Sequence, residues 1–312
     1  MLVPKMPDCR SPETTKTSRE AVFKFLSRSI GFLPLAVLVA GALLFGRSLP
    51  AWGYMWAMAI ALFGGVKWLS WWEVRNAVAH RPARSLAYLT LWPGMNARSF
   101  LCGLRPRKPA LRNWFWALSK TCLGVVLLWS VARYVPSARP LLRGWVGLFG
   151  LVLVLHFGTF EIVALGWQAL GVDAEPIMQS PIFSDSLSEF WGKRWNLGFH
   201  QLAHELVFRP VRPLLGVRLA TLLVFLFSGL IHELVISLPA RGGYGLPTSY
   251  FLLQSAGVLF ERSGIGRWLH LRRGVPGWAF TAIMTAAPAF WLFHPLFVLR
   301  VVLPFMKAIR AL

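Results

Sequence analysis

Residues 219–238 read LATLLVFLFSGLIHELVISL, an apolar stretch that is long enough to cross a bilayer. His232 lies inside this stretch. An ionisable side chain at membrane depth is costly, so such a residue usually faces a protein interior or a wet cavity and has a function there. His232 is therefore the first candidate for chemistry. The alternative is a structural hydrogen bond to a neighbouring helix, for which ~0.6 kcal/mol is typical.

The composition of the whole chain agrees with this stretch. Hydrophobic residues make up 56% of the 312 residues and charged residues 14%, and the mean hydropathy is +0.55. These values exclude an ordinary water-soluble domain and predict an all-α, multi-pass transmembrane helical protein. We expect about eight spans, at roughly 30–46, 52–72, 114–132, 145–169, 217–238, 247–261, 276–291 and 293–306. Lys67 is expected to snorkel from the second span to the interface.

The distribution of positive charge predicts the orientation. The formal net charge is +21, but the Lys and Arg residues lie in short loops between apolar segments, which argues against nucleic acid as a partner and for a lipid bilayer. Of the 33 Lys and Arg residues, 25 fall on one predicted side and 6 on the other. We therefore expect both termini in the cytoplasm, with the protein in the plasma or inner membrane of a bacterium or in the endoplasmic reticulum of a eukaryote.

Two units are predicted along the chain. Residues 1–29 are polar and basic and form an N-terminal tail, and residues 30–312 form a single integral-membrane domain. The loop at 184–213, SDSLSEFWGKRWNLGFHQLAHELVFRPVRP, predicts an interfacial amphipathic helix. Its apolar face would contain Phe199, Leu202, Ala203, Leu206 and Val207, opposite His200, Gln201, His204 and Glu205.

Aromatic and basic residues precede that helix. Trp191, Lys193, Arg194 and Trp195 combine aromatic anchors with cations, which suits an anionic ligand or a headgroup surface. Simple membrane anchoring would use the same residues.

Metal and cofactor chemistry lack sequence support. The strings that begin at His204-Glu205 and His232-Glu233 start like HExxH but lack the second histidine. The three cysteines do not have the spacing of a zinc site. A P-loop, a dinucleotide fingerprint and a serine nucleophile elbow are also missing from the sequence. We therefore expect no metal and no cofactor.

The chain resembles the membrane-bound O-acyltransferase (MBOAT) superfamily, and within it the wax synthase-like branch. The resemblance rests on residues 190–196 (FWGKRWN) and 228–234 (SGLIHEL), and is supported by 91–95 (LWPGM), 242–247 (GGYGLP) and 250–254 (YFLLQ). It extends from about residue 86 to 306 and implies an MBOAT-like fold of membrane helices around a tunnel.

The resemblance also implies a reaction: transfer of a fatty acyl group from acyl-CoA, a co-substrate, to the hydroxyl of a lipophilic acceptor. The family's histidine maps onto His232 and its asparagine onto Asn196. An uncharged imidazole can accept the alcohol's proton, and an amide can donate to the developing oxyanion. Trp191, Lys193, Arg194 and Trp195 are then candidates for binding CoA. Diacylglycerol acyltransferases have Asp and Trp where this chain has Lys193 and Arg194, so a long-chain alcohol or a sterol is favoured as acceptor.

Other polar residues at membrane depth leave two alternatives. Gln254 is a further candidate for substrate binding, and with Glu161 and Gln168 it would either line the tunnel or bond neighbouring helices. A relay of His232, Glu161 and Gln254 would instead suit a transporter or lipid channel, and an inactive scaffold of the same fold is a third alternative. If the fifth span starts near Val217, His232 lies ~22 Å along it, so a deep tunnel or a tilted helix is needed.

Overall fold

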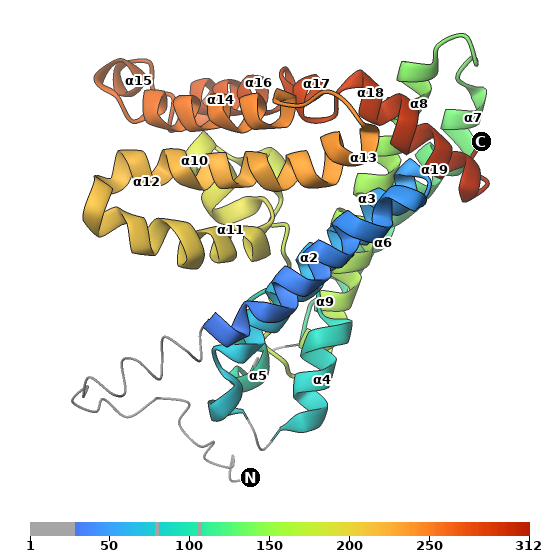
Figure 1. The fold of residues 1–312 in the computed structure, drawn as a ribbon. Coiled ribbons are helices and arrows are strands. Elements are labelled where there is room, and N and C mark those ends of the chain that lie inside the picture. Colours follow the sequence, from blue (N-terminus) through green and yellow to red (C-terminus); the bar gives the residue numbers. More distant parts are fainter. Residues whose placement is uncertain (1–28, 79–80, 105–107) are drawn as a thin grey trace.

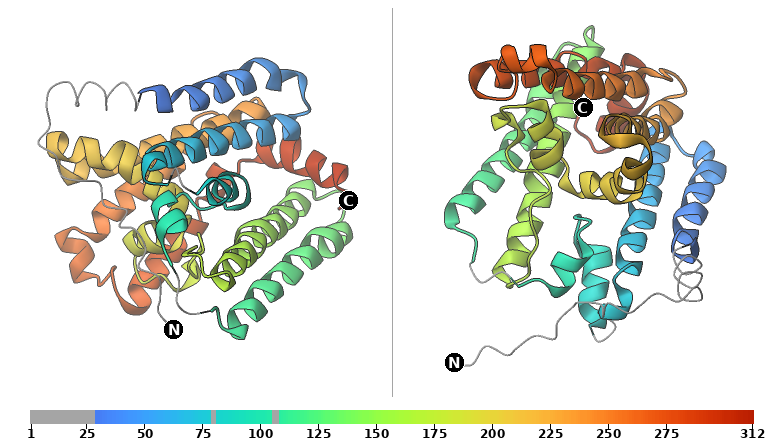
Figure 2. Two further views of the ribbon diagram at one scale, coloured as in Figure 1. Left: turned by 90° about the horizontal axis from the view of Figure 1, so that it is seen from below. Right: turned by 90° about the vertical axis from the view of Figure 1, so that its left-hand side faces the viewer.

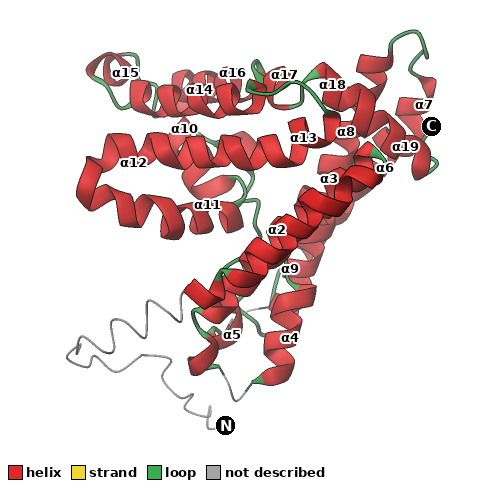
Figure 3. Ribbon diagram, in the orientation of Figure 1, coloured by secondary structure: helices red, strands yellow, loops and turns green. Residues whose placement is uncertain are grey.

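The computed structural model describes residues 29–78, 81–104 and 108–312. The predicted tail at 1–29 therefore lies, except for Ser29, outside the described residues. The described chain is helical (Figure 3), and its one extended contact is an isolated bridge between Leu104 and Val172. The prediction of an all-α fold is confirmed.

The helices form three consecutive groups (Figure 1). The first contains α2 (Leu33–Phe45), η1 (Gly46–Ser48), α3 (Ala51–Trp72), η2 (Arg75–Ala77), α4 (Pro82–Leu91) and α5 (Ala97–Cys102). The second contains α6 (Leu111–Val126), η3 (Leu127–Val131), α7 (Ala132–Tyr134), α8 (Pro140–Val152), η4 (Leu153–Thr159) and α9 (Phe160–Ala169).

The third group runs from residue 181 to the C-terminus. It contains η5 (Pro181–Phe183), α10 (Leu187–Glu189), η6 (Phe190–Arg194), α11 (Leu197–Ala203), η7 (His204–Phe208), α12 (Arg209–His232), η8 (Glu233–Ser237) and α13 (Leu238–Ala240). It continues with α14 (Leu246–Glu261), α15 (Gly264–Trp268), α16 (Gly274–Ala286), α17 (Ala289–Leu292), α18 (Pro295–Phe297), η9 (Val298–Val302) and α19 (Leu303–Ala308). Figure 2 shows the second group on one side of the molecule and α12 and α14 on another.

Five helical stretches are long and apolar enough to cross a membrane: Ser29–Ser48, Leu111–Tyr134, Pro140–Ala169, Leu197–Ala240 and Gly274–Leu292. They coincide with five of the eight expected spans. The stretches expected at 52–72, 247–261 and 293–306 are also helical but are not among the five; α14, for example, has only 16 residues. Large apolar side chains on the outer surface, such as Leu44 (73% exposed) and Phe115 (63% exposed), fit a lipid environment.

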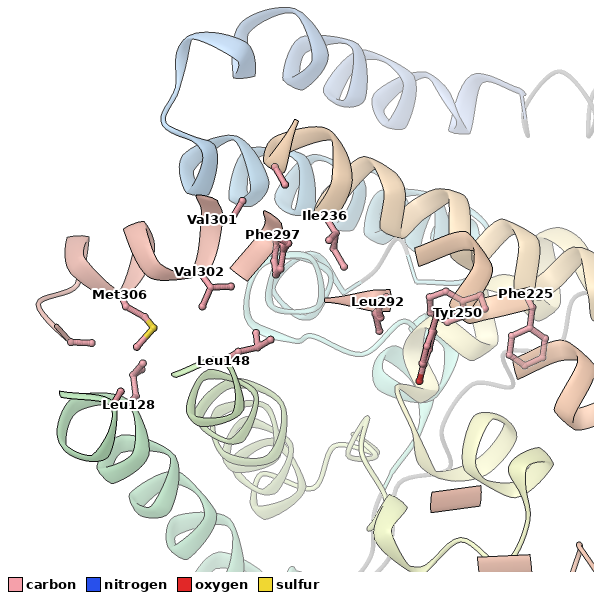
Figure 4. Packing of buried hydrophobic residues seen from close by; sticks show 14 of the residues in the cluster. Leu128, Leu148, Phe225, Ile236, Tyr250, Leu292, Phe297, Val301, Val302 and Met306 are labelled. Atoms are coloured by element: carbon pink, nitrogen blue, oxygen red, sulfur yellow. The ribbon is translucent and has the colours of Figure 1, made fainter. Parts of the chain in front are cut away.

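The core joins the second group to the C-terminus. Leu128 of η3 and Leu148 of α8 pack in one cluster with Val301, Val302 and Met306 (Figure 4). Between α6 and α8 the backbones approach closely, because a Cβ atom at Gly124 would lie 2.8 Å from the carbonyl oxygen of Gly150. Glycines allow such close approach of helices in membranes.

Lys67 corrects one prediction. It does not snorkel: only 1% of its surface is exposed, its Nζ donates to the carbonyl of Gly94, and it lies 3.4 Å from the centre of the Tyr88 ring. The buried Nζ atom thus has a hydrogen-bond acceptor and lies over an aromatic ring. Lys67 thus ties α3 to the turn at 92–96.

A reversal at Gly216 positions the third group. Gly216 has φ 75° and ψ 173°, which breaks the helical path inside α12. The chain doubles back there, so α11 and η7 run beside the C-terminal part of α12 (Figure 1). Phe199 of α11 contacts two residues of the returning arm: its ring centre lies 6.0 Å from that of Phe227 and 6.4 Å from that of His232. The region predicted as a surface helix is therefore one arm of a hairpin.

Candidate active site

A cavity of about 1570 Å³ lies between the second and third groups of helices. It exceeds the ~300–1,000 Å³ of typical small-molecule pockets, so it has room for more than one extended ligand. Apolar side chains make up most of its wall, and His232, Asn196, Trp191 and Trp195 also line it. Four of the predicted site residues are thus brought to one cavity.

His232 is the last residue of α12 and is followed by the π-helical segment η8. π-helical turns are frequent at functional sites. The Nδ1 atom lies 2.7 Å from the carbonyl oxygen of Ser228. A carbonyl only accepts, so the proton of the neutral ring is on Nδ1 and Nε2 keeps its lone pair. No described residue hydrogen-bonds Nε2, and the ring packs 4.5 Å from that of Phe251. His232 is arranged to accept a proton from a ligand in the cavity.

Asn196 has a left-handed backbone conformation, with φ 43°, that asparagine tolerates better than most residues. It is the N-cap of α11, and its Oδ1 accepts a hydrogen bond of 3.3 Å from the Phe199 N–H. Because this donor fixes which amide atom is the oxygen, the other is Nδ2. No acceptor for Nδ2 is found among the described residues. Asn196 thus uses its oxygen for structure and keeps its amide donors.

Phe199 connects these two residues. Its backbone N–H holds the Asn196 side chain, and its ring contacts the His232 ring edge to face. The reversal at Gly216 also bears on the expected difficulty that His232 lies far along a span, because the arm before Gly216 lies beside the returning arm and brings the α11 segment that Asn196 caps to His232, as the contact of Phe199 with His232 shows.

Trp191 and Trp195 come from the π-helical segment η6 and the residue that follows it. The Trp191 indole donates to Gln254 Oε1 at 3.2 Å, and Gln254 Nε2 donates to the Met284 carbonyl at 2.6 Å. Gln254 is fully buried and does not belong to the cavity wall. The structure therefore places this predicted substrate-binding residue behind Trp191, where it joins α14 to η6 and α16.

The predicted cationic residues lie outside the cavity wall. Arg194 pairs with Glu189 at 2.9 Å and also donates to the carbonyls of Gln179 and Ser180. Burial raises the pKa of Glu189, but its hydrogen bonds from Asp185 N–H and Arg194 and the nearby charges outweigh this and leave the pKa below its usual value. Arg194 is thus engaged in holding its own loop.

Lys193 is exposed and forms no ion pair with another described residue. The arginines that do line the cavity are Arg112 and Arg262, which the sequence analysis did not select. They come from α6 and from the end of α14, far apart in the sequence, so no local motif connects them.

Three further histidines line the cavity: His156, His200 and His204. The sequence analysis placed the last two on the polar face of the predicted amphipathic helix, did not select them as site residues and passed over His156. The signal that selected His232, an ionisable residue inside a predicted span, also applies to His156. Glu161 lines the cavity as well and pairs with Lys120.

Glu233, next to His232, faces away from this chemistry. Its Oε1 accepts from Gly245 N–H (3.0 Å), Thr248 N–H (3.1 Å) and the Thr248 hydroxyl (2.8 Å). These groups form the first turn of α14, so the carboxylate satisfies and neutralises that helix N-terminus.

Comparison with known proteins shows which family and which enzymes this region resembles. Residues 174–253 match the family described as membrane bound O-acyl transferase. Probable long-chain-alcohol O-fatty-acyltransferase 2 of Arabidopsis thaliana is 36% identical over 143 residues, which are 42% of this chain and 41% of the relative.

Two other relatives give similar results. The long-chain-alcohol O-fatty-acyltransferase of Simmondsia chinensis is 33% identical over 138 residues, 40% of this chain and 39% of the relative. Probable long-chain-alcohol O-fatty-acyltransferase 3 of A. thaliana is 29% identical over 199 residues, 59% of this chain and 57% of the relative. The chain thus spans about two fifths of the length of the first of these relatives. The matched region holds Trp191, Asn196 and His232, so the part of the chain that carries the candidate site is similar to the membrane bound O-acyl transferase family and to long-chain-alcohol O-fatty-acyltransferases within it.

Proposed function

We propose that this protein is an O-acyltransferase that moves a fatty acyl group from acyl-CoA to the hydroxyl of a long-chain alcohol and so makes a wax ester. The observation that carries the proposal is that one largely apolar cavity is lined by both His232 and Asn196, whose imidazole Nε2 and amide Nδ2 have no partner among the described residues. The relatives named for this activity support the choice of reaction.

The two side chains suit the two halves of the reaction. His232 Nε2 takes the proton of the alcohol as its oxygen bonds to the thioester carbon. The carbonyl oxygen gains negative charge, which the Asn196 Nδ2–H group stabilises. The C–S bond then breaks, and the CoA thiolate takes the proton back from His232. The acyl group passes directly to the alcohol, so the enzyme forms no covalent intermediate.

The cavity would serve as the tunnel of this enzyme. Its apolar wall suits an acyl chain and a long-chain alcohol and keeps water from the thioester. Both termini would lie in the cytoplasm, from which CoA enters. Lys193 is a candidate for its phosphates, and Arg112 and Arg262 of the cavity wall are better placed than Arg194, which is paired with Glu189.

The transporter relay of His232, Glu161 and Gln254 finds no support in these positions. Both ends of the Gln254 amide are bonded away from the cavity, and Glu161 pairs with Lys120. We therefore favour chemistry over transport.

Membranes from cells that express the chain test the proposal. They are given radiolabelled acyl-CoA with a long-chain alcohol, a sterol or diacylglycerol, and the products are separated by chromatography. Wax ester from the wild type, and none from His232→Ala, is the expected result. His270→Asn removes a histidine that does not line the cavity and serves as the matched control. If the wild-type membranes form no ester with any acceptor, the proposed activity is wrong.

A further inference from the structure

A second histidine lines the same cavity from a different helix. His156 lies in the π-helical segment η4, between α8 and α9. Its ring meets Phe160 edge to face at 5.5 Å. Its Nδ1 atom is buried and has no hydrogen-bond partner among the residues that the structure describes. Native proteins rarely leave a buried polar atom in this state, so this nitrogen needs an explanation.

The state of the ring follows from that burial. A neutral imidazole carries one proton. If the proton were on Nδ1, a buried N–H group would lack an acceptor, and such orphan donors are rarer than orphan acceptors. The proton therefore belongs on Nε2, the ring nitrogen that remains available to a ligand in the cavity. His156 thus presents an N–H donor.

The two histidines are complementary. His232 carries its proton on Nδ1, which faces Ser228, and offers a lone pair at Nε2. His156 has the opposite tautomer and offers a proton at Nε2. One cavity thus contains one histidine that can take a proton and one that can donate a hydrogen bond.

The segment that carries His156 packs against the segment that carries Asn196. The next residue, Phe157, meets the Trp195 ring edge to face at 6.1 Å. Trp195 directly precedes Asn196 in the chain. Phe157, Trp195 and Asn196 also line the cavity. The segment that carries His156 therefore packs against the loop that carries Asn196. The two N–H donors, His156 Nε2–H and Asn196 Nδ2–H, come from these two neighbouring segments.

We propose that His156 is a second oxyanion donor: its Nε2–H hydrogen-bonds the thioester carbonyl oxygen together with Asn196 Nδ2–H. The inference rests on the proposed acyl transfer. Oxyanion sites commonly use more than one donor, because the negative charge on oxygen grows in the transition state. His156 keeps its proton throughout, and the proton of the alcohol still goes to His232. The substrate oxygen would thus be the acceptor for His156 Nε2–H, while Nδ1 remains a buried acceptor without a partner among the described residues.

Steady-state kinetics of purified protein with acyl-CoA and a long-chain alcohol test this role. His156→Phe keeps an aromatic ring of similar size but has no donor. We expect kcat to fall about 100-fold while KM for either substrate changes less than about threefold, because the bond strengthens in the transition state. His156→Gln places an amide donor near the position of Nε2, and we expect it to recover at least tenfold of that loss. Size-exclusion chromatography in detergent measures how much of each variant is folded.

Several outcomes would overturn the inference. A kcat of His156→Phe within twofold of the wild type would show that no important bond is lost. A rise in KM for the alcohol alone, with kcat unchanged, would make His156 an acceptor-binding residue instead. Equal losses in the Phe and Gln variants would indicate a packing role. If His156→Phe does not fold, His156→Met, also without a donor, is compared with His156→Gln in the same way. Absence of ester from the wild type would instead refute the acyl transfer on which the inference rests.

Discussion

The cavity wall, here called the cavity face, and the contacts of α14 with η8, η6 and α16, here called the seam, differ in the hydrogen bonds that their polar side chains make. In the seam, Glu233 Oε1 accepts from three groups, and Gln254 bonds Trp191 and Met284. On the cavity face, His232 Nε2 and Asn196 Nδ2 have no partner among the described residues. Polar groups of neighbouring helices thus have two roles: the bonded ones hold helices together, and the open ones on the cavity wall could meet a substrate. Adjacent residues differ in this way: Glu233 Oε1 is bonded, although Glu233 Oε2 is buried without a partner among the described residues, whereas His232 lines the cavity.

The largest expected effect comes from His232→Ala. Loss of the base should lower kcat for ester formation by about 10²–10⁴, which is the usual contribution of a general base. The seam is untouched, so the amount of folded protein in the membrane should equal that of the wild type. The rate of labelled ester formation per folded protein measures this. Unchanged activity would place the base elsewhere.

Asn196→Asp separates the two roles of this side chain, which are capping of α11 through its oxygen and hydrogen-bond donation through its amide nitrogen. The carboxylate still caps α11 through an oxygen, but it has no amide donor and repels an oxyanion. We expect kcat to fall about 10²–10³ with thermal stability near that of the wild type. Asn196→Ala, which also removes the cap, should lose about 1 kcal/mol of stability in addition. If Asn196→Asp retains full activity, the amide does not act on the substrate.

Glu233→Ala should lower stability and keep most of the activity, the reverse of what we expect for His232→Ala. It leaves the first turn of α14 without its acceptor, and we expect a loss of about 3 kcal/mol in stability, since bonds to charged groups are strong. Thermal unfolding in detergent, followed by fluorescence-detected size exclusion, measures the shift. Activity per folded molecule should fall far less than in His232→Ala. A stable but inactive Glu233→Ala protein would show that Glu233 acts in the reaction and not in holding helices together.

The smallest expected effect is that of Gln254→Leu. The substitution is close in volume and leaves the Trp191 indole and the Met284 carbonyl without partners, so about 1–2 kcal/mol of stability should be lost. The KM for the alcohol should not change, because Gln254 lies behind the cavity wall. A raised KM with unchanged stability would restore Gln254 as a substrate-binding residue.

The sequence allowed the helical class, five of the spans and the cavity position of His232 to be predicted. These follow from local properties: the length of an apolar stretch and the cost of an ionisable group inside it. Asn196 required the resemblance to a family, since nothing local distinguishes it from a surface asparagine. The bonds of Gln254 and Lys67 could not be predicted, because their partners, Met284 and Gly94, lie 30 and 27 residues away in the sequence.

The reversal at Gly216 was also missed. Gly216 lies between Arg212 and Arg218, and a single glycine there does not show in which direction the chain continues. Its φ of 75° is visible only in the structure. His156 was missed for a different reason, since its significance depends on an atom that lacks a partner.

Gly216 also makes the geometry of the proposed reaction depend on the backbone conformation of one residue. His232 lies 16 residues further along the chain, so the returning arm is ~24 Å long at 1.5 Å per residue. A change of about 5° in the angle between the arms would shift its far end by about 2 Å, and displacements of about 1 Å are enough to slow a reaction about 100-fold. A lever of this length converts a small bend into a lost alignment. Because the residues on both sides of Gly216 are exposed, contacts farther along the two arms, such as that of Phe199 with Phe227, would have to keep the proposed site aligned.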